Sequence, residues 1–175
     1  MTNNKLDIKL RPTEILDLDF LFQFQLDKQG RYIAAFMPKD PTDKFAYLNK
    51  YTKLLNDPTV NNQTIILDNV IVGSIAKFVI EGDTEITYWI DRKFWGQGIA
   101  TKALKEFLAI ETYRPILGRV AFDNFGSQKV LEKCGFVKSV RIKDLPMPGK
   151  QKLKNIFTNF RHNKGITANC RYKIV

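Results

Sequence analysis

Apolar positions recur along the chain with two periods, one typical of strands and one typical of helices. Alternating or β-branched runs predict strands over residues 6–11, 63–68, 69–80, 84–91, 114–122 and 136–142. Helical spacing predicts a helix over 14–26 with Thr13 as its N-cap, and further helices over 45–57, 97–111 and 127–134. A last strand is expected over 166–175, and 145–165 stays unassigned apart from a short strand near Ile156.

The order β-α-α-β-β-β-α-β-α-β-β predicts a mixed α/β fold. The runs 63–68 and 69–80 meet at Asp68-Asn69 and therefore predict a hairpin. A helix separates 84–91 from 114–122, and such a crossover makes the two strands parallel neighbours. A ligand site is expected at the carboxyl ends of this pair.

Length and composition favour one soluble domain spanning residues 1–175. The 175 residues are 44% hydrophobic and 26% charged, which is ordinary for a globular protein. We find no apolar run of transmembrane length and no signal peptide, so the expected location is cytoplasmic. The two cysteines, Cys134 and Cys170, fit no zinc spacing. The presence of a single histidine, His162, argues against a His-rich metal site and against most Ser/His/Asp machinery.

The net charge of +10 is concentrated in the last quarter of the chain. Residues 138–175 contain ten Lys/Arg and one acid, whereas residues 1–137 contain 18 Lys/Arg and 17 acids. A basic segment of this kind attracts phosphates, RNA or an acidic protein surface. The alternative is a solvated lysine-rich surface.

The most specific local pattern is RKFWGQGIAT (92–101), which lies between a predicted strand and a predicted helix. Gly96 and Gly98 would let the backbone approach a ligand, and the first amides of the helix would bind an anion. Neither GxxxxGK[ST] nor GxGxxG is present, so this is not a Walker loop or a dinucleotide fingerprint. The alternative is an ordinary helix start.

A second pattern, AFDNFGSQKVLEKCGF (121–136), follows about thirty residues later. Asn124 and Ser127 lie at the predicted start of a helix, where capping is the alternative to a functional role. Gly135 is equally well explained as a helix stop.

Together these motifs resemble the GCN5-related N-acetyltransferase (GNAT) superfamily, and most closely its RimJ/RimL-like branch. The matching residues are EITYWIDRKFWGQGIATKAL (85–104) and RVAFDNFGSQKVLEKCGF (119–136). The resemblance implies a mostly antiparallel sheet with one parallel pair splayed to hold acetyl-CoA as co-substrate. It also implies direct attack of an acceptor primary amine on the thioester, without an acyl-enzyme.

The resemblance also carries a set of co-substrate-binding residues. The pyrophosphate would lie on the amides of 96–101, the pantetheine along the strand ending at Ile90, and Asn124 would hydrogen-bond the pantetheine or the adenine-side arm. The residues implied are Ile90, Gly96, Gln97, Gly98, Ile99, Ala100, Thr101 and Asn124.

Two positions depart from the family pattern. Trp95 stands where Gln or Arg is usual, as often in the RimL-like branch, and Leu131 stands where a general-acid tyrosine is frequent. By analogy with that branch, Ser127 is the candidate that protonates the leaving thiolate, with an N-cap as the alternative.

Strand alternation selects the candidate base. It places Glu85, Thr87 and Trp89 on one face of the 84–91 strand, so Glu85 could take the ammonium proton if this face lines the acceptor cleft. The alternative is a surface carboxylate. Tyr88, Trp89 and Cys134 are expected to serve packing.

The predicted function is therefore acetyl-CoA-dependent N-acetylation of a protein N-terminus or a small amine. A polycationic acceptor is disfavoured, and a homodimer is compatible with the family. One alternative is a catalytically silent acyl-CoA sensor, which the loss of the tyrosine at position 131 favours. Another is a nucleic-acid-binding module that uses residues 138–175, which predicts steeply salt-dependent RNA binding.

Overall fold

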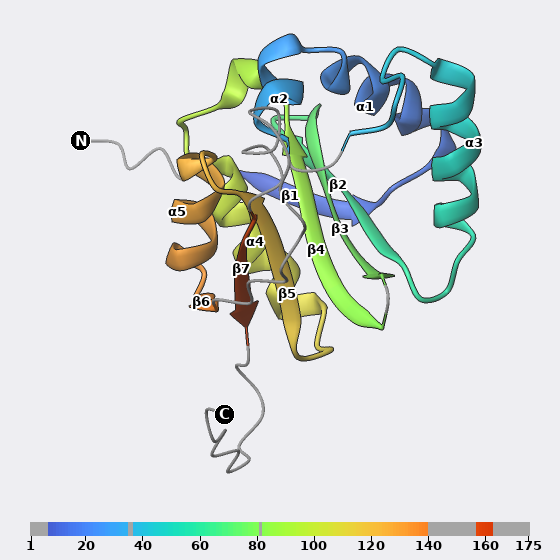
Figure 1. Ribbon diagram of the computed structural model, residues 1–175. Helices are drawn as coiled ribbons and strands as arrows, with labels where there is room; N and C mark the ends of the chain where they lie inside the picture. The colour runs from blue at the N-terminus through green and yellow to red at the C-terminus, as the bar shows by residue number, and fades with distance from the viewer. Residues whose placement is uncertain (1–6, 35–36, 81, 140–156, 163–175) are drawn as a thin grey trace, which may run out of the picture.

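The computed structural model describes residues 7–34, 37–80, 82–139 and 157–162. In these residues the strands form a seven-stranded sheet in the order β1-β2-β3-β4-β5-β7-β6 (Figure 1). The strands are β1 (Ile8–Pro12), β2 (Asn61–Leu67), β3 (Val70–Ile80), β4 (Asp83–Ile90), β5 (Ile116–Ala121), β6 (Val137–Ser139) and β7 (Phe157–His162). The helices are α1 (Leu18–Gln25), α2 (Lys28–Ile33), α3 (Lys44–Leu55), α4 (Ile99–Ile110) and α5 (Phe125–Lys133), with 3-10 turns η1 (Ile15–Asp17) and η2 (Arg92–Phe94).

The sheet confirms the predicted mixed fold with one parallel pair. Strands β1 to β4 pair antiparallel in chain order, and β5, β7 and β6 pair antiparallel on the other side. The β2–β3 hairpin turns at Asp68 and Asn69, whose φ angles of 48° and 65° suit a two-residue hairpin turn. Between β4 and β5 the parallel register consists of Glu85 opposite Leu117, so these two strands separate soon after they meet.

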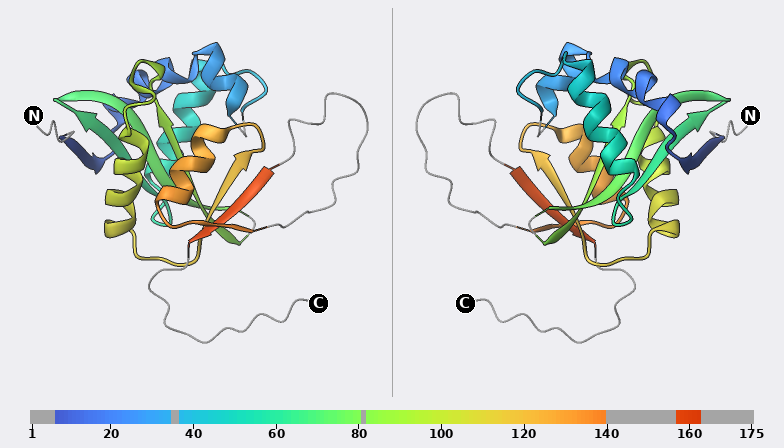
Figure 2. Two further views of the ribbon diagram at one scale, coloured as in Figure 1. Left: turned by 90° about the vertical axis from the view of Figure 1, so that its left-hand side faces the viewer. Right: turned by 90° about the vertical axis from the view of Figure 1, so that its right-hand side faces the viewer.

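Helices cover both faces of the sheet. On one face, α4 and α5 enclose the main core, whose fully buried side chains include Ile65, Ile75, Ile99, Leu104, Phe107 and Leu131. On the other face, α1 and α3 enclose a smaller core of Leu18, Leu21, Phe22 and Tyr47. Figure 2 shows α5 nearest the viewer in one side view and α3 nearest in the other. No helix in the described ranges has the length and apolar character needed to cross a lipid bilayer.

The helix predicted over 14–26 forms over 15–25, but its first turn is the 3-10 turn η1 and its N-cap is Glu14, not Thr13. Asp17 accepts two hydrogen bonds from Arg11, at 2.6 and 2.7 Å, and further bonds from the Glu14 amide and the Thr64 hydroxyl. Burial alone raises the pKa of Asp17, but these bonds lower it below its ordinary value. The chain therefore forms the η1 turn and then α1, and Thr13 donates to Asn62 instead of capping a helix.

Other differences lie at short elements. The six-residue α2 was not predicted, because it is too short to show a period; its cap is Asp27, which accepts from the Gly30 amide at 2.7 Å. Strand β7 lies within the segment that sequence left unassigned, close to the strand suggested near Ile156. The strand expected over 166–175 and most of the basic segment 138–175 lie outside the described residues.

Candidate active site

A cleft of about 770 Å³ opens along β4. Its wall combines residues of β3 and β4 with residues of α2, α3 and α5 and with the loop that precedes α4. The cleft thus lies where the parallel strands separate, as the crossover rule predicts for an α/β ligand site.

The loop before α4 presents main-chain amides to this cleft. Gly96 and Gly98 have φ angles of 77° and 80°, and a Cβ at either would meet nothing within 4 Å, so glycine is needed there for conformation and not for space. Gly98 is the N-cap of α4, and no side chain caps this end of the helix. Because helix dipole and uncapped amides both favour negative charge, the start of α4 is suited to hold a phosphate. The cleft wall includes Gly96 and Gly98 to Thr101.

Two neighbouring side chains of this loop have structural contacts. The Trp95 indole donates to the Ile90 carbonyl at 2.8 Å and so ties the loop to the end of β4. Gln97 does not line the cleft, and its amide donates to the Lys93 carbonyl at 3.3 Å. Ten site residues were singled out from the sequence, and all of them except Gln97 lie on the cleft wall.

Asn124 joins the start of α5 to α2. Its Oδ1 accepts from the Ser127 amide at 3.0 Å, and its Nδ2 donates to the Ile33 carbonyl at 3.2 Å. Asn124 is therefore the N-cap of α5, and the alternative that Ser127 is the cap is wrong. The Ser127 hydroxyl is not used for capping and belongs to a side chain on the cleft wall.

Tyr88 adds a second hydroxyl beside Ser127. Its phenol donates to the Ser127 carbonyl at 3.3 Å, and it lines the cleft. Burial raises the pKa of Tyr88 to about 12, although an interaction with the Ser127 hydroxyl acts in the opposite direction. The phenol is therefore protonated at neutral pH.

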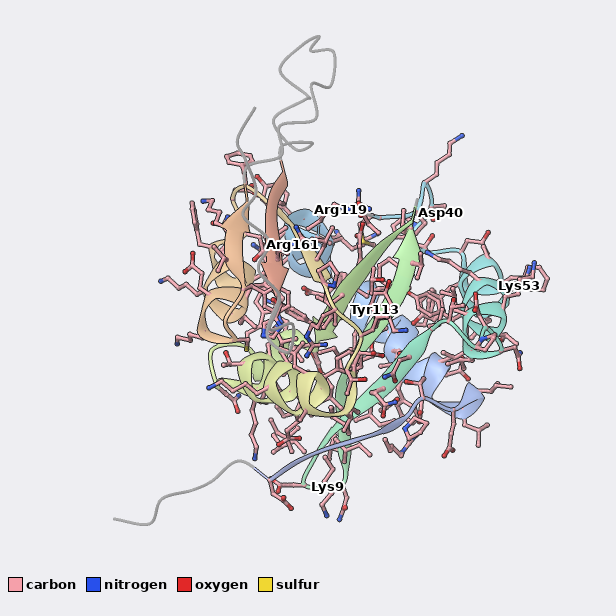
Figure 3. All side chains as sticks on the ribbon, turned by 90° about the horizontal axis from the view of Figure 1, so that it is seen from below. Lys9, Asp40, Lys53, Tyr113, Arg119 and Arg161 are labelled. Carbon is pink, nitrogen blue, oxygen red and sulfur yellow. The ribbon has the colours of Figure 1, made fainter. Side chains whose placement is uncertain are left out.

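The face predicted for Glu85 is confirmed, and the alternative of a surface carboxylate is wrong. Ile86 and Ile90 join the core under α4, whereas Trp89 packs on Gly30 of α2, where a Cβ would come within 2.8 Å of the indole. Glu85 is only 4% exposed and lines the cleft. Its carboxylate forms a two-point ion pair with Arg119, in which Nε donates to Oε2 at 2.9 Å and Nη2 contacts Oε1. Figure 3 shows Arg119 between the β4 and the β5–β7 ribbons.

The candidate acid and the candidate base lie on opposite faces of the sheet. Ser127 belongs to α5, and Tyr88 packs on the core under α4 and α5. Glu85 and Arg119 project from the face that carries α2, because they alternate with core residues of β4 and β5. A thioester placed between β4 and β5 would thus have a carboxylate on one side and hydroxyl donors on the other.

Sequence reasoning missed five charged residues of the cleft wall, namely Lys50, Asp57, Arg119, Lys129 and Lys133. The last two are the lysines of α5. The two lysines are four residues apart on α5, a spacing that places them on one helical face and that the sequence could have shown. Arg119 carries no local signal, because its role depends on the pairing of β4 with β5.

Leu131, Cys134 and His162 are not on the wall of the main cleft, although Leu131 shares a smaller cavity of about 60 Å³ with Ser127 and Tyr88. Leu131 is 1% exposed and packs on Gly118. Cys134 is in the core, where burial raises the pKa of its thiol, and its sulfur lies 3.5 Å from the Thr101 carbonyl. His162 is not on the cleft wall; its Nδ1 accepts from Arg114 at 3.1 Å. The described residues contain no cluster of three or more His, Cys, Asp or Glu able to hold a metal ion.

The fold and the cleft define an acyl-CoA-type acetyltransferase domain, and comparison with known proteins establishes the family. The family model described as "Acetyltransferase (GNAT) domain" matches residues 7–137, so the chain belongs to the GNAT acetyltransferase family. It is 25% identical over 151 residues, 78% of this chain and 83% of the relative, to the uncharacterized N-acetyltransferase p20 of Bacillus licheniformis.

Solved structures share the fold at low identity. RimL, a ribosomal L7/L12 alpha-N-protein acetyltransferase in complex with coenzyme A, has a TM-score of 0.69 and 17% identity, over 89% of this chain and 93% of that one. The spermidine N-acetyltransferase of Vibrio cholerae, in complex with CoA and spermine, has a TM-score of 0.68 and 19% identity, over 88% of this chain and 92% of that one. Two proteins with different acceptors are thus equally similar in fold.

Proposed function

We propose that this chain is an acetyl-CoA-dependent N-acetyltransferase that transfers the acetyl group to a primary amine by direct attack on the thioester. The observation that carries the proposal is the uncapped start of α4, which opens into a cleft where β4 and β5 separate. Family membership and the CoA bound in both neighbours support acetyl-CoA as the co-substrate.

In this proposal the pyrophosphate binds the amides of 98–101, and the pantetheine runs along β4 towards the seam with β5. The Ile90 carbonyl already accepts the Trp95 indole, so pairing with the pantetheine falls mainly to positions before it. Asn124 holds the start of α5 in place and has a second amide hydrogen for the ligand. Lys129 and Lys133 add positive charge along the same wall.

The reaction then requires a base and an acid on either side of the thioester carbonyl. Glu85 accepts the proton of the acceptor ammonium, directly or through water, and the neutral amine attacks the carbonyl carbon. The nitrogen of the tetrahedral intermediate loses its second proton as the C–S bond breaks, and Ser127 donates its proton to the thiolate and regains one from that nitrogen through water. The rest of the rate enhancement comes from holding the two reactants in contact.

The charges on the cleft wall favour an acceptor with a single ammonium group. Among the described wall residues the carboxylates are Asp57 and Glu85, whereas the cations are Lys50, Arg119, Lys129 and Lys133. Glu85 is paired with Arg119, and Asp57 accepts from the amide and hydroxyl of Thr59. With Lys129 and Lys133 on the co-substrate side and Glu85 paired with Arg119, Lys50 and Asp57 remain, so a polyamine or an aminoglycoside would meet no excess of negative charge. A protein N-terminus, as in the RimJ/RimL-like branch, or a small monoamine fits better.

The experiment is calorimetric titration with acetyl-CoA, followed by thiol release with a fixed amine panel. The panel contains 2-phenylethylamine, spermidine, an N-terminal ribosomal peptide and its N-acetylated form as the control. Binding with thiol release that requires a free amine supports the proposal. Absence of acetyl-CoA binding contradicts it.

A catalytically silent acyl-CoA sensor is the second candidate, favoured by the buried Leu131 at the position of the usual acid. It predicts binding of acetyl-CoA without thiol release on any amine. Five expectations from the sequence stay predictions. They are a nucleic-acid-binding module over 138–175, an acidic or RNA partner, a homodimer, a cytoplasmic location, and one domain over 1–175.

A further inference from the structure

The Glu85–Arg119 ion pair spans the point where the sheet divides. Glu85 is opposite Leu117 in the parallel register, and Arg119 lies two residues further along β5, on the same face as Leu117. Beyond this point β4 and β5 diverge into the cleft. The guanidinium therefore bridges the two strands just where their main-chain pairing ends.

The geometry of the pair fixes the carboxylate in one orientation. Both oxygens of Glu85 are engaged by one planar guanidinium, with Nε at 2.9 Å from Oε2 and Nη2 against Oε1. The Glu85 side chain is 5% exposed and that of Arg119 is 27% exposed. This two-point contact restrains both the rotation and the position of the carboxylate, which a single hydrogen bond from a lysine would not do.

Each carboxylate oxygen still has a lone pair for another donor, since a carboxylate offers about four acceptor sites. Both residues also line the cleft, so an ammonium group or a water molecule in the cleft can meet the carboxylate. The ion pair thus holds the carboxylate without closing it to the reaction.

We propose that Arg119 is a positioning residue for the transfer reaction: it aims the Glu85 carboxylate into the cleft and keeps it charged within a buried wall. This inference rests on the proposed function, in which Glu85 is the base. Without the guanidinium, the carboxylate would be free to rotate and its charge would lie unpaired in a desolvated position.

The pair has a matched counterpart away from the cleft. Arg11 makes a two-point pair with Asp17, whose side chain is also 5% exposed while that of Arg11 is 34% exposed. Neither residue lines the cleft. Arg11→Met therefore removes the same kind of interaction and controls for a loss of stability alone.

The first test follows the Glu85 carboxyl directly and needs no acceptor. The chain has six glutamates, so carboxyl-labelled [¹³C]glutamate gives few resonances, and Glu85→Gln identifies the one from residue 85. In Arg119→Met we expect this resonance to move from its wild-type position at neutral pH and to broaden, because the carboxylate loses the two-point contact that fixes its orientation. Arg119→Lys should show a smaller change, and Arg11→Met should leave the resonance at its wild-type position.

Other ionisable side chains on the described cleft wall are unchanged in all these variants; they are Lys50, Tyr51, Asp57, Tyr88, Lys129 and Lys133.

The second test measures thiol release with the fastest amine of the panel. Arg119→Met should lower kcat roughly 10- to 100-fold and move the acid limb of the kcat/KM profile to higher pH, with acetyl-CoA affinity within about twofold of wild type. Arg119→Lys should restore the position of the acid limb of the kcat/KM profile but only part of kcat, because lysine keeps the positive charge and loses the two-point contact.

Some outcomes would overturn the inference. One is an Arg119→Met variant whose Glu85 resonance and pH–rate profile match wild type, with only the thermal stability lowered, as in Arg11→Met. If Arg119→Met does not fold, a wild-type kcat in Arg119→Lys overturns it equally. The proposed function fails separately, by absence of acetyl-CoA binding or by an unchanged rate in Glu85→Gln.

Discussion

The two ends of the cleft are built in different ways. At the start of α4 the ligand surface is main chain: two glycines with positive φ and the uncapped amides that follow them in sequence. At the seam between β4 and β5 it is side chain: Glu85 from one strand, Arg119 from another, and Ser127 from a helix. The surface at the start of α4 is formed by residues close in sequence and depends little on side-chain identity. The surface between β4 and β5 requires particular residues held by tertiary contacts. Co-substrate binding and turnover should therefore be separable by mutation.

This contrast decides how much the sequence could predict. The 92–101 motif predicted an uncapped helix start on a cleft wall, as the structure has it, because glycines and a helix start act within ten residues. The hairpin at Asp68-Asn69 and the parallel β4–β5 pair were predicted for the same reason, from local turn chemistry and a crossover. The pairing of Glu85 with Arg119 was not, because the two residues are 34 positions apart and meet only through strand register. The residue at which the first helix begins was not predicted either, because Asp17 in its first turn is held by Arg11 and Thr64, which lie outside the helix.

The largest effect is expected from a charge placed at the main-chain end. Gly98→Glu should weaken acetyl-CoA binding more than 100-fold, because a carboxylate would stand where the pyrophosphate binds and a side chain would strain φ at 80°. The measurement is calorimetry. Gly82→Glu is the control, since Gly82 has φ of 83°, open space and no place on the cleft wall. Equal binding in both variants would contradict the site.

Glu85→Gln should affect turnover and leave binding alone. Loss of the base predicts a fall in kcat of roughly 100-fold or more at neutral pH, with Kd for acetyl-CoA within about twofold. Steady-state thiol release and calorimetry give the two numbers. Glu106→Gln, on the outer side of α4 beside Lys102, is the matched control and should keep wild-type values. A Glu85→Gln enzyme with undiminished kcat would remove this residue from the mechanism.

A pair of variants can show whether Ser127 or Tyr88 is the hydroxyl that donates the proton. Ser127→Ala should lower kcat about tenfold because the thiolate loses its donor. Tyr88→Phe should keep kcat and lower the free energy of unfolding by about 1 kcal/mol, through loss of the bond to the Ser127 carbonyl. Thiol release and urea unfolding measure these effects. The opposite ranking of kcat values would assign proton donation to Tyr88.

The smallest loss of acetyl-CoA binding is expected from a substitution of Asn124. Asn124→Ala should lower the free energy of unfolding by about 1 kcal/mol, as should Asp43→Ala, because each removes a helix N-cap. Only Asn124→Ala should also weaken acetyl-CoA binding, a few-fold, because Asn124 lines the cleft and ties α5 to α2. Equal acetyl-CoA affinity in the two variants would make Asn124 a cap and no more.

The most direct test of the whole account is to locate bound CoA on the protein. In ¹H–¹⁵N spectra titrated with CoA, the account predicts the largest shifts at the amides of Gly98, Ile99, Ala100 and Thr101, followed by those of β4 and of Ser127. Saturable shifts confined to residues away from the cleft, such as Lys9 on β1 or Lys53 on α3 (Figure 3), would contradict it.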